Sequence, residues 1–284
     1  MGHPNSLRSI LLKRIGSRAL LYVILIAYAV LTIFPFLMSL ISSFKSFDEL
    51  YASALRLPSV WQWENYAMAW EAGEFAQYFQ NSVFVTVISI VGLLVLGSMA
   101  AYALSRYEFR GRRIIQTYFL AGLVLPFRLA VIPVFILLRD LGLLDSLWGL
   151  ILIYIAADLP FAIFILTNYF RTLPIEVEEA AVMDGAGPFR IYAQILVPML
   201  RPALATVGVV VFIWVWNDTF VPLVFIQSSE KFTLMLGLTN FFGRYLRQWH
   251  YILAGSMITL MPVVICYLFA SRQFIEGLTT GVRK

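Results

Sequence analysis

Six apolar stretches recur along the chain and are separated by polar segments. They cover residues 19–41, 82–104, 114–138, 147–170, 202–226 and 251–271. A helix needs about 20 apolar residues to cross the hydrocarbon layer of a bilayer, and each stretch approximates that length. Helices are the expected form of separate spans, because they satisfy their backbone hydrogen bonds internally. The pattern predicts an all-α integral membrane protein with six transmembrane helices.

The composition agrees with this prediction and excludes several functions. The chain is 61% hydrophobic and 13% charged, whereas soluble domains average about 25% charged residues. Its net charge of +5 does not indicate nucleic-acid binding, because the basic residues flank the spans. The sequence has no phosphate-binding loop and no G-x-S-x-G motif, and its single cysteine and two histidines suggest no metal cluster. We expect a chain that is not an enzyme by itself and holds no metal or cofactor.

The basic residues also predict the orientation of the spans. Fourteen lie on one side: Arg8, Lys13, Arg14, Arg18, Arg106, Arg110, Arg112, Arg113, Arg171, Arg190, Arg201, Arg272, Arg283 and Lys284. Six lie on the other: Lys45, Arg56, Arg139, Lys231, Arg244 and Arg247. The positive-inside rule puts the larger set in the cytoplasm. We therefore expect a multi-pass protein of the plasma or inner membrane, with a cytoplasmic segment 1–18, a transmembrane domain 19–271 and a cytoplasmic tail 272–284.

One cytoplasmic stretch, residues 174–198, predicts two short helices with a sharp corner between them. Pro174 suits the start of the first helix, and Gly185 suits its end because glycine accepts a left-handed backbone. A second helix follows Gly187-Pro188 and closes at Val197-Pro198. On the first helix, a shared face carries Val177, Ala180, Ala181 and Asp184. The small alanines leave a ridge that a partner can approach closely.

This stretch resembles a family motif. The strings Glu179-Ala180-Ala181 and Asp184-Gly185-Ala186, with the later Ile195 and Pro198, resemble the EAA loop of ABC importer permeases. Two further segments are similar to the carbohydrate-uptake subfamily, MalG-type subunits in particular: Trp216-Asn217-Asp218 followed by Pro222-Leu223, and Phe274 to Thr279. Together these motifs cover much of residues 80–284.

The resemblance implies a permease subunit of a binding-protein-dependent ABC importer for a sugar or related solute. Residues 171–201 would be its coupling loop, which seats in a cleft of an ATP-binding subunit. The implied partners are two ATP-binding subunits that hold ATP and Mg, a second, MalF-like permease and an external solute-binding protein. ATP hydrolysis by the partners would drive alternating access.

Three charged residues, Arg128, Asp158 and Asp218, lie within predicted spans. A charge there costs at least ~2.5–3.5 kcal/mol and normally faces a cavity or a partner. Arg128 and Asp158 lie near the middle of neighbouring helices, so a structural ion pair and a substrate role both remain open. With Trp216 and Asn217 these residues are candidates for the substrate pathway, although the resemblance leaves open that the sugar site lies mainly in the other permease. Interrupted helices are expected at Pro126, Pro133, Pro160 and Pro222.

Two external loops are rich in aromatic residues. The first, residues 42–81, holds Trp61, Trp63, Tyr66 and Trp70, which are typical of a membrane interface but also suit stacking on sugars. The second covers residues 227–250. The resemblance implies that it meets the binding protein, with Phe241, Phe242, Tyr245 and Trp249 as candidate contacts. Alternatively, some of them only anchor the sixth helix.

Other functions were weighed against the importer. One is an ion-coupled secondary transporter in which Asp158 or Asp218 carries protons. Another is a membrane-embedded aspartyl hydrolase, although neither acid lies in a G-x-G-D-like setting. Neither explains the EAA-like loop. Importers of non-sugar solutes such as glycerol-3-phosphate share these motifs, so the sequence leaves the solute undetermined.

Overall fold

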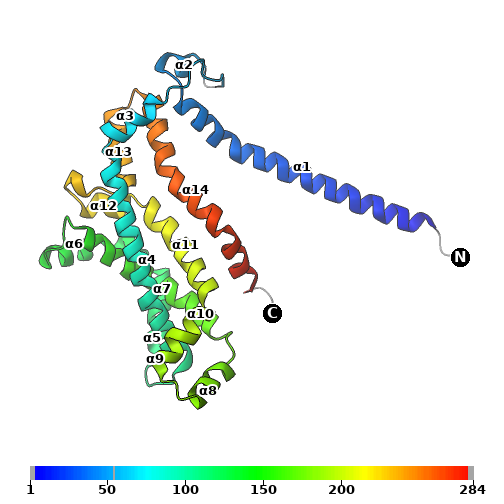
Figure 1. Cartoon of the computed structure of the whole chain (residues 1–284), viewed down its shortest axis with the longest axis vertical. Helices are drawn as coiled ribbons and strands as arrows, with labels where there is room; N and C mark the ends of the chain where they lie inside the picture. The colour runs from blue at the N-terminus through cyan, green and yellow to red at the C-terminus, as the bar shows by residue number, and fades with distance from the viewer. Residues whose placement is uncertain (1–3, 54, 281–284) are drawn as a thin grey trace. The chain divides into compact units, whose positions relative to one another are not determined.

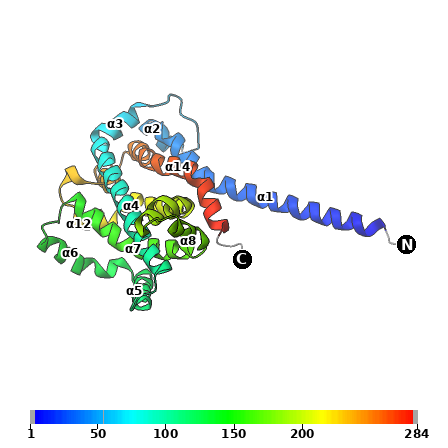
Figure 2. The same cartoon turned by 60° about the horizontal axis from the view of Figure 1, so that its bottom comes forward.

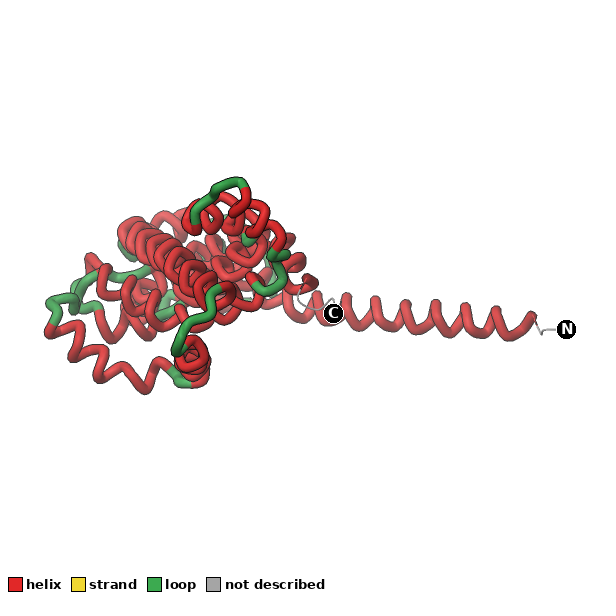
Figure 3. The backbone as a smooth tube through the Cα atoms, turned by 90° about the horizontal axis from the view of Figure 1, so that it is seen from below, coloured by secondary structure: helices red, strands yellow, loops and turns green. Residues whose placement is uncertain are grey.

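The computed structural model describes residues 4–53 and 55–280, with side chains over 18–53 and 55–269. These residues form helices joined by short loops, and no strand occurs among them (Figure 3). The chain divides into two compact units: unit 1 is Met1–Ala69 with Tyr245–Met257, and unit 2 is Trp70–Arg244 with Ile258–Lys284. Residues 281–284 of the predicted tail and the side chains of Phe274–Thr279 lie outside the described part.

Four helices among the described residues are long and apolar enough to cross a membrane. They are α1 (Pro4–Ser43), α4 (Phe75–Arg106), α7 (Leu147–Phe170) and α14 (Trp249–Thr280). Two bent helix pairs raise the number of candidate spans to six. The all-α membrane fold is confirmed, and the apolar pattern located α7 to the residue.

The third predicted span, 114–138, is not one continuous helix. It divides into α5 (Arg112–Val124), a 3₁₀ turn η1 (Phe127–Ala130) and α6 (Val131–Asp140), with a bend of 96°. Leu125 has an extended backbone because it precedes Pro126, and a proline disfavours the helical conformation of the residue before it. Pro126 therefore breaks the span as predicted.

The other prolines have weaker effects than expected. Pro160 lies inside an uninterrupted α7, and Pro133 and Pro222 lie in the first turns of α6 and α12 (Phe220–Phe225), where an N–H is unpaired in any case. The fifth span, 202–226, breaks elsewhere: α11 (Arg201–Asn217) ends where Asp218 turns extended. The expectation of interruption at Pro133, Pro160 and Pro222 is thus corrected.

Helices α4 and α7 lie side by side and form the core of unit 2 (Figures 1 and 2). Two glycines of α4 permit this close approach. A methyl group on Gly92 would lie 2.6 Å from Ile155 Cδ1, and one on Gly97 would lie 3.0 Å from Ala162 Cβ. Small residues at such contacts let membrane helices pack backbone to backbone. The remaining elements of unit 2 are α8 (Glu176–Met183), α9 (Pro188–Arg190), the π segment η2 (Ile191–Leu196), α10 (Val197–Met199), η3 (Ser229–Lys231) and α13 (Leu234–Arg244).

In unit 1, the loop that starts at residue 42 and is predicted to be external folds onto the end of α1. Asn65, in α3 (Glu64–Ala72), donates hydrogen bonds to the carbonyls of Ser43 and Lys45, which α1 leaves unpaired. Phe44 packs its ring against Trp61, Trp63 and Tyr66, at 4.7–5.2 Å between centroids. The short helix α2 (Phe47–Ala52) starts at a capping box between Ser46 and Glu49. These loop aromatics therefore contribute to packing, whatever else they contact.

Candidate functional site

In residues 171–201, the predicted coupling loop, the corner expected after the first helix is present. Helix α8 ends at Met183, and Gly185 has a left-handed backbone with φ of +79°. The N–H of Ala186 donates to the carbonyl of Ala181, and that of Gly185 donates to Val182, both at 2.9 Å. This pair of bonds is the Schellman motif that ends many helices. The second helix then runs from Pro188 to Met199 and meets α11 at a bend of 72°. Helix α8 starts at Glu176, two residues later than expected from Pro174.

The first coupling-loop helix is fastened to the end of α4 by an ion pair. Arg106 Nε lies 2.5 Å from Glu178 Oε1, and both side chains are nearly buried, at 12% and 13% exposure. Arg106 also donates through Nη2 to the carbonyl of Leu173, at 3.0 Å. One residue of α4 therefore holds both α8 and the chain that leads into it.

The second coupling-loop helix is fastened to α4 as well. The hydroxyl of Tyr192 lies 2.8 Å from Ser98 Oγ, and its ring lies 5.5 Å from that of Tyr102. The Tyr102 ring in turn contacts Phe170 at the end of α7. The coupling loop thus packs on the transmembrane core through both of its helices.

Coupling-loop residues divide into an exposed and a buried set. Glu179, Ala180, Asp184, Gly185 and Pro198 are exposed, and Ala186 and Ile195 are half-buried. Ala181 is only 6% exposed and belongs to the core of unit 2. It is not available as part of an open ridge, which corrects the sequence-based expectation for this alanine. The most exposed apolar side chains of the loop are Met183 at 87% and Phe189 at 75%, and sequence reasoning missed them.

A cavity of about 610 Å³ opens in the middle of unit 2; apolar side chains supply most of its lining, and we call it the polar cavity for the charged and polar groups that it gathers. It brings together four predicted pathway residues, Arg128, Asp158, Asn217 and Asp218, and adds Tyr154 and Trp214 among its lining. Arg128 and Asp158 do not pair: the ion pairs among the described residues are Arg106–Glu178, Arg139–Asp140 and Lys231–Asp145. Instead, the Arg128 guanidinium lies 4.9 Å from the centre of the Phe220 ring.

The two carboxylates of this cavity differ in their environment. Asp218 accepts hydrogen bonds from the Tyr154 hydroxyl and from the N–H groups of Phe220 and Val221, so it caps α12. Asp158 accepts no hydrogen bond from any described residue and is the carboxylate with free capacity. Trp216 does not line the cavity. It is 3% exposed and donates to the carbonyl of Thr259, which corrects its assignment to the pathway.

Asp145 lies just before α7, at the end of that helix remote from the coupling loop, and joins its own loop to the loop that follows α12. Its carboxylate accepts hydrogen bonds from the N–H groups of Gln227 and Ser228 and from the Ser228 hydroxyl, and it pairs with Lys231 at 2.9 Å. Partial burial raises the pKa of Asp145, but the bonds from Ser228, Gln227 and Lys231 outweigh it and hold the pKa well below its ordinary value. The start of α7 is therefore tied to the loop of residues 227–250 at neutral pH.

The candidate contacts for a binding protein are scattered. Phe241 is 3% exposed and packs on Phe75, so it is a core residue of unit 2, which corrects its assignment. Phe242 is half-buried. Tyr245 and Trp249 belong to unit 1, where the Tyr245 ring contacts Tyr251 and Trp249 is 47% exposed.

Comparisons with known proteins agree with one another. The family described as "Binding-protein-dependent transport system inner membrane component" matches residues 93–275. The chain is 39% identical to the diacetylchitobiose uptake system permease protein NgcG of Streptomyces coelicolor, over 93% of this chain and 88% of that protein. It is 34% identical to the arabinooligosaccharides transport system permease protein AraQ of Halalkalibacterium halodurans, over 95% and 99%. Among solved structures, it is similar to a chain of a bacterial ABC transporter involved in the import of alginate, with a TM-score of 0.81, 28% identity and coverage of 92% and 97%.

Proposed function

The chain belongs to the family of binding-protein-dependent transport system inner membrane components, and from this premise we propose that it is the permease subunit of an importer for a sugar or oligosaccharide. The match over residues 93–275 carries the proposal, because it includes the coupling loop and the polar cavity. Family membership speaks against an ion-coupled transporter and against a membrane-embedded hydrolase.

The chemistry of the cavity supports a sugar as the solute. Asp158 and Asn217 present oxygen and nitrogen atoms that suit hydroxyl groups, and Trp214 is 46% exposed and offers an aromatic face. The relatives are named for diacetylchitobiose and arabinooligosaccharides. The cavity holds two carboxylates and one guanidinium, so its charged groups alone do not select between neutral and acidic solutes. The names of these relatives favour a neutral or amino oligosaccharide as the solute.

The coupling loop is the proposed contact with an ATP-binding subunit. Glu179, Ala180 and Met183 are exposed on or beside α8 and would enter the partner, while Ala181 supports α8 from within. The Arg106–Glu178 ion pair would carry a displacement of α8 directly to α4, which packs along α7. ATP and Mg would be bound by the partner, and the chain would perform no hydrolysis itself.

One six-span bundle supplies half of a transport pathway, so a second, homologous permease is required. With the coupling loop in the cytoplasm, both termini lie there too, and the Asp145 junction faces the external binding protein. Asp145 would hold the second external loop in a fixed place while that protein docks.

Transport assays with a charge-neutral variant test the proposed solute. We expect Asp158→Asn to raise the KM for a neutral or amino oligosaccharide, and Trp214→Ala to do the same. Trp216→Phe serves as the control, since Trp216 lies outside the cavity. Unchanged transport by Asp158→Asn and Trp214→Ala, together with normal assembly, would show that the solute does not use this cavity.

A further inference from the structure

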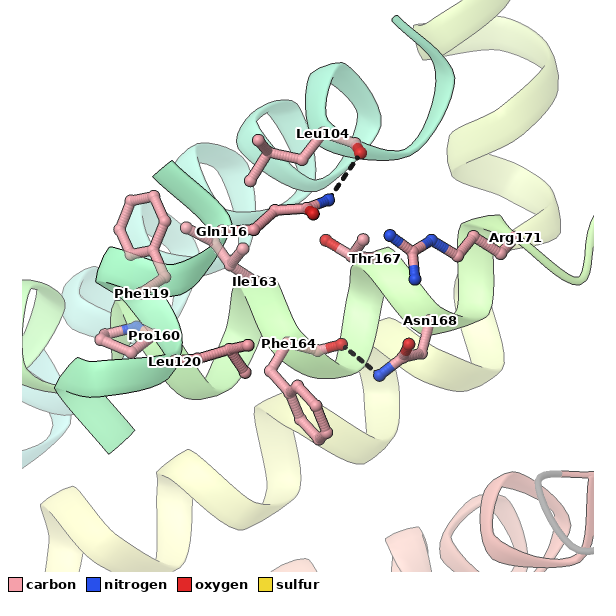
Figure 4. A pocket seen from close by; sticks show the side chains of 10 residues that line it. All are labelled: Leu104, Gln116, Phe119, Leu120, Pro160, Ile163, Phe164, Thr167, Asn168 and Arg171. Atoms are coloured by element: carbon pink, nitrogen blue, oxygen red, sulfur yellow. Dashed lines mark hydrogen bonds between the residues drawn. The ribbon is translucent and has the colours of Figure 1, made fainter. Parts of the chain in front are cut away.

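A second cavity lies between α4, α5 and α7, at the end of unit 2 that carries the coupling loop (Figure 4). It has a volume of about 120 Å³ and an apolar floor made by Phe119, Leu120, Pro160, Ile163 and Phe164. A buried water needs two to four polar partners, which this floor does not supply. The floor therefore suits hydrocarbon better than water.

Thr167 places an unsatisfied hydroxyl beside this floor. The residue is 7% exposed, and its Oγ1 has no hydrogen-bond partner among the described residues. Helical threonines usually donate to the carbonyl four residues earlier, as Thr117 and Thr206 do here. Thr167 lines the cavity instead (Figure 4). A buried hydroxyl without a partner indicates a ligand atom that completes it.

The rim of the cavity is basic. Arg171 follows the last residue of α7 and lines the mouth, and no described carboxylate pairs with it. Gln116 lines the cavity too, and its Nε2 shares the Leu104 carbonyl with Arg112 Nε. Gln116 also borders a neighbouring hollow that contains Arg112 and Arg113. Arg171 thus lies at the polar end of an apolar cavity, and Arg112 and Arg113 line the neighbouring hollow together with Glu108.

We propose that this cavity binds an anionic phospholipid of the cytoplasmic leaflet. One acyl chain would fill the apolar floor, the phosphate would lie against Arg171, and an ester or phosphate oxygen would accept from Thr167. Basic pockets at the cytoplasmic ends of membrane helices recognise anionic head groups by this combination of charge and apolar contact. The proposal uses the orientation given under the proposed function, but not the identity of the solute.

The cavity is lined by the ends of α7 and α4 that adjoin the coupling loop. Arg171 begins the coupling loop, and Leu104 lies two residues before Arg106. A lipid seated here would bind the ends of the helices that receive the displacement of α8. We therefore expect anionic lipid to increase the coupling of ATP hydrolysis to transport.

Native mass spectrometry of the complete importer, exchanged between phosphatidylglycerol and phosphatidylcholine nanodiscs, tests the site. We expect retained phosphatidylglycerol, and about fivefold less of it in Arg171→Gln, the factor ordinarily associated with one arginine at an anionic membrane surface. Thr167→Val should also lower retention, because it removes the hydroxyl that bonds to the lipid. If the Thr167 hydroxyl does not contact the lipid, retention will be unchanged in this variant. Arg139→Gln is the matched control, because Arg139 is exposed and pairs with Asp140 at the far end of α6. Equal retention of the two lipids, or equal loss in Arg139→Gln, would overturn the proposal.

A photoreactive phosphatidylglycerol, with the reactive group in its acyl chain, locates the bound molecule. We expect adducts on peptides that contain Leu120 or Phe164, and their loss in Leu120→Trp, which fills the cavity and keeps all three arginines. Excess inorganic phosphate should not displace the lipid; displacement would indicate a simple anion site. If these peptides carry adducts but the importer transports no sugar, the lipid site is supported and the proposed solute is contradicted. Adducts only on the partner permease would overturn the lipid site itself.

Discussion

The corner at Gly185 offers the sharpest test of the coupling loop. A side chain at this position would meet no atom within 4 Å, so Gly185→Ala introduces no steric clash with the surroundings. Its whole cost is conformational: an L-residue at φ of +79° costs on the order of 1–2 kcal/mol. That energy lowers the population of the native backbone conformation at Gly185 about 5- to 30-fold relative to other conformations of the corner. The orientation of α8 relative to the second helix is then lost in part.

Gly187 provides a matched control two residues later. It also has no neighbour within 4 Å, but its φ is −76°, which any residue adopts. Gly187→Ala should therefore be neutral, or stabilise the fold by about 0.4–1 kcal/mol through the unfolded chain. Gly185→Asn should lie between the two, since asparagine tolerates the left-handed region better than alanine.

The assay is sugar uptake per ATP hydrolysed by the reconstituted importer, with hydrogen exchange of the α8 amides as the structural readout. We expect Gly185→Ala to assemble, to exchange faster in α8 and to transport less sugar per ATP, while Gly187→Ala matches the unmodified chain. Equal uptake and exchange in the two alanine variants would refute the role assigned to this corner.

Three further predictions concern contacts and orientation. Arg106→Glu should uncouple transport, because loss of one partner of a buried ion pair costs about 3–5 kcal/mol when burial is complete and somewhat less at the 12–13% exposure seen here. The double variant Arg106→Glu with Glu178→Arg should restore part of the uptake. If it restores none, the pair does not act as a unit. Asp145→Ala should weaken stimulation of ATPase activity by loaded binding protein. Because the pKa of Asp145 is lowered, the stability that its carboxylate contributes is present above the ordinary carboxyl pKa and is lost only as pH falls through the depressed value. This group should therefore cause no loss of stimulation in the unmodified importer between pH 8 and 5. A cysteine at Gly187 should react with an impermeant reagent only from the cytoplasm, and one at Ser229 only from outside; the reverse labelling would invert the proposed topology.

The sequence predicted the features that depend on residues close together in the chain. The apolar run over 147–170 matched α7, and Asp184-Gly185 located the corner, because helix length and glycine conformation depend on few neighbours. The effect of Pro160 was not predictable in this way. Its ring packs against α5, where a methyl on Gly122 would lie 2.9 Å from Pro160 Cγ. A contact between helices of this kind cannot be read from the sequence around the proline.

The contacts that build the site join residues far apart in the chain. Arg106 was recognised only as a positive charge at a membrane border, yet it pairs with Glu178. Arg128, Asp158 and Asp218 line one cavity, whereas Trp216 does not, and its indole is turned toward α14. Spacing alone does not reveal which face of α11 lines a cavity, because α11 is apolar on every side.

The direct test of the whole account is transport by the purified assembly. Proteoliposomes would contain this chain, its partner permease and the ATP-binding subunits, with loaded binding protein supplied outside and ATP enclosed. The account predicts sugar uptake that requires ATP and binding protein together, and none from this chain alone under a proton or sodium gradient. Uptake by the isolated chain driven by a gradient, without ATP, would contradict it.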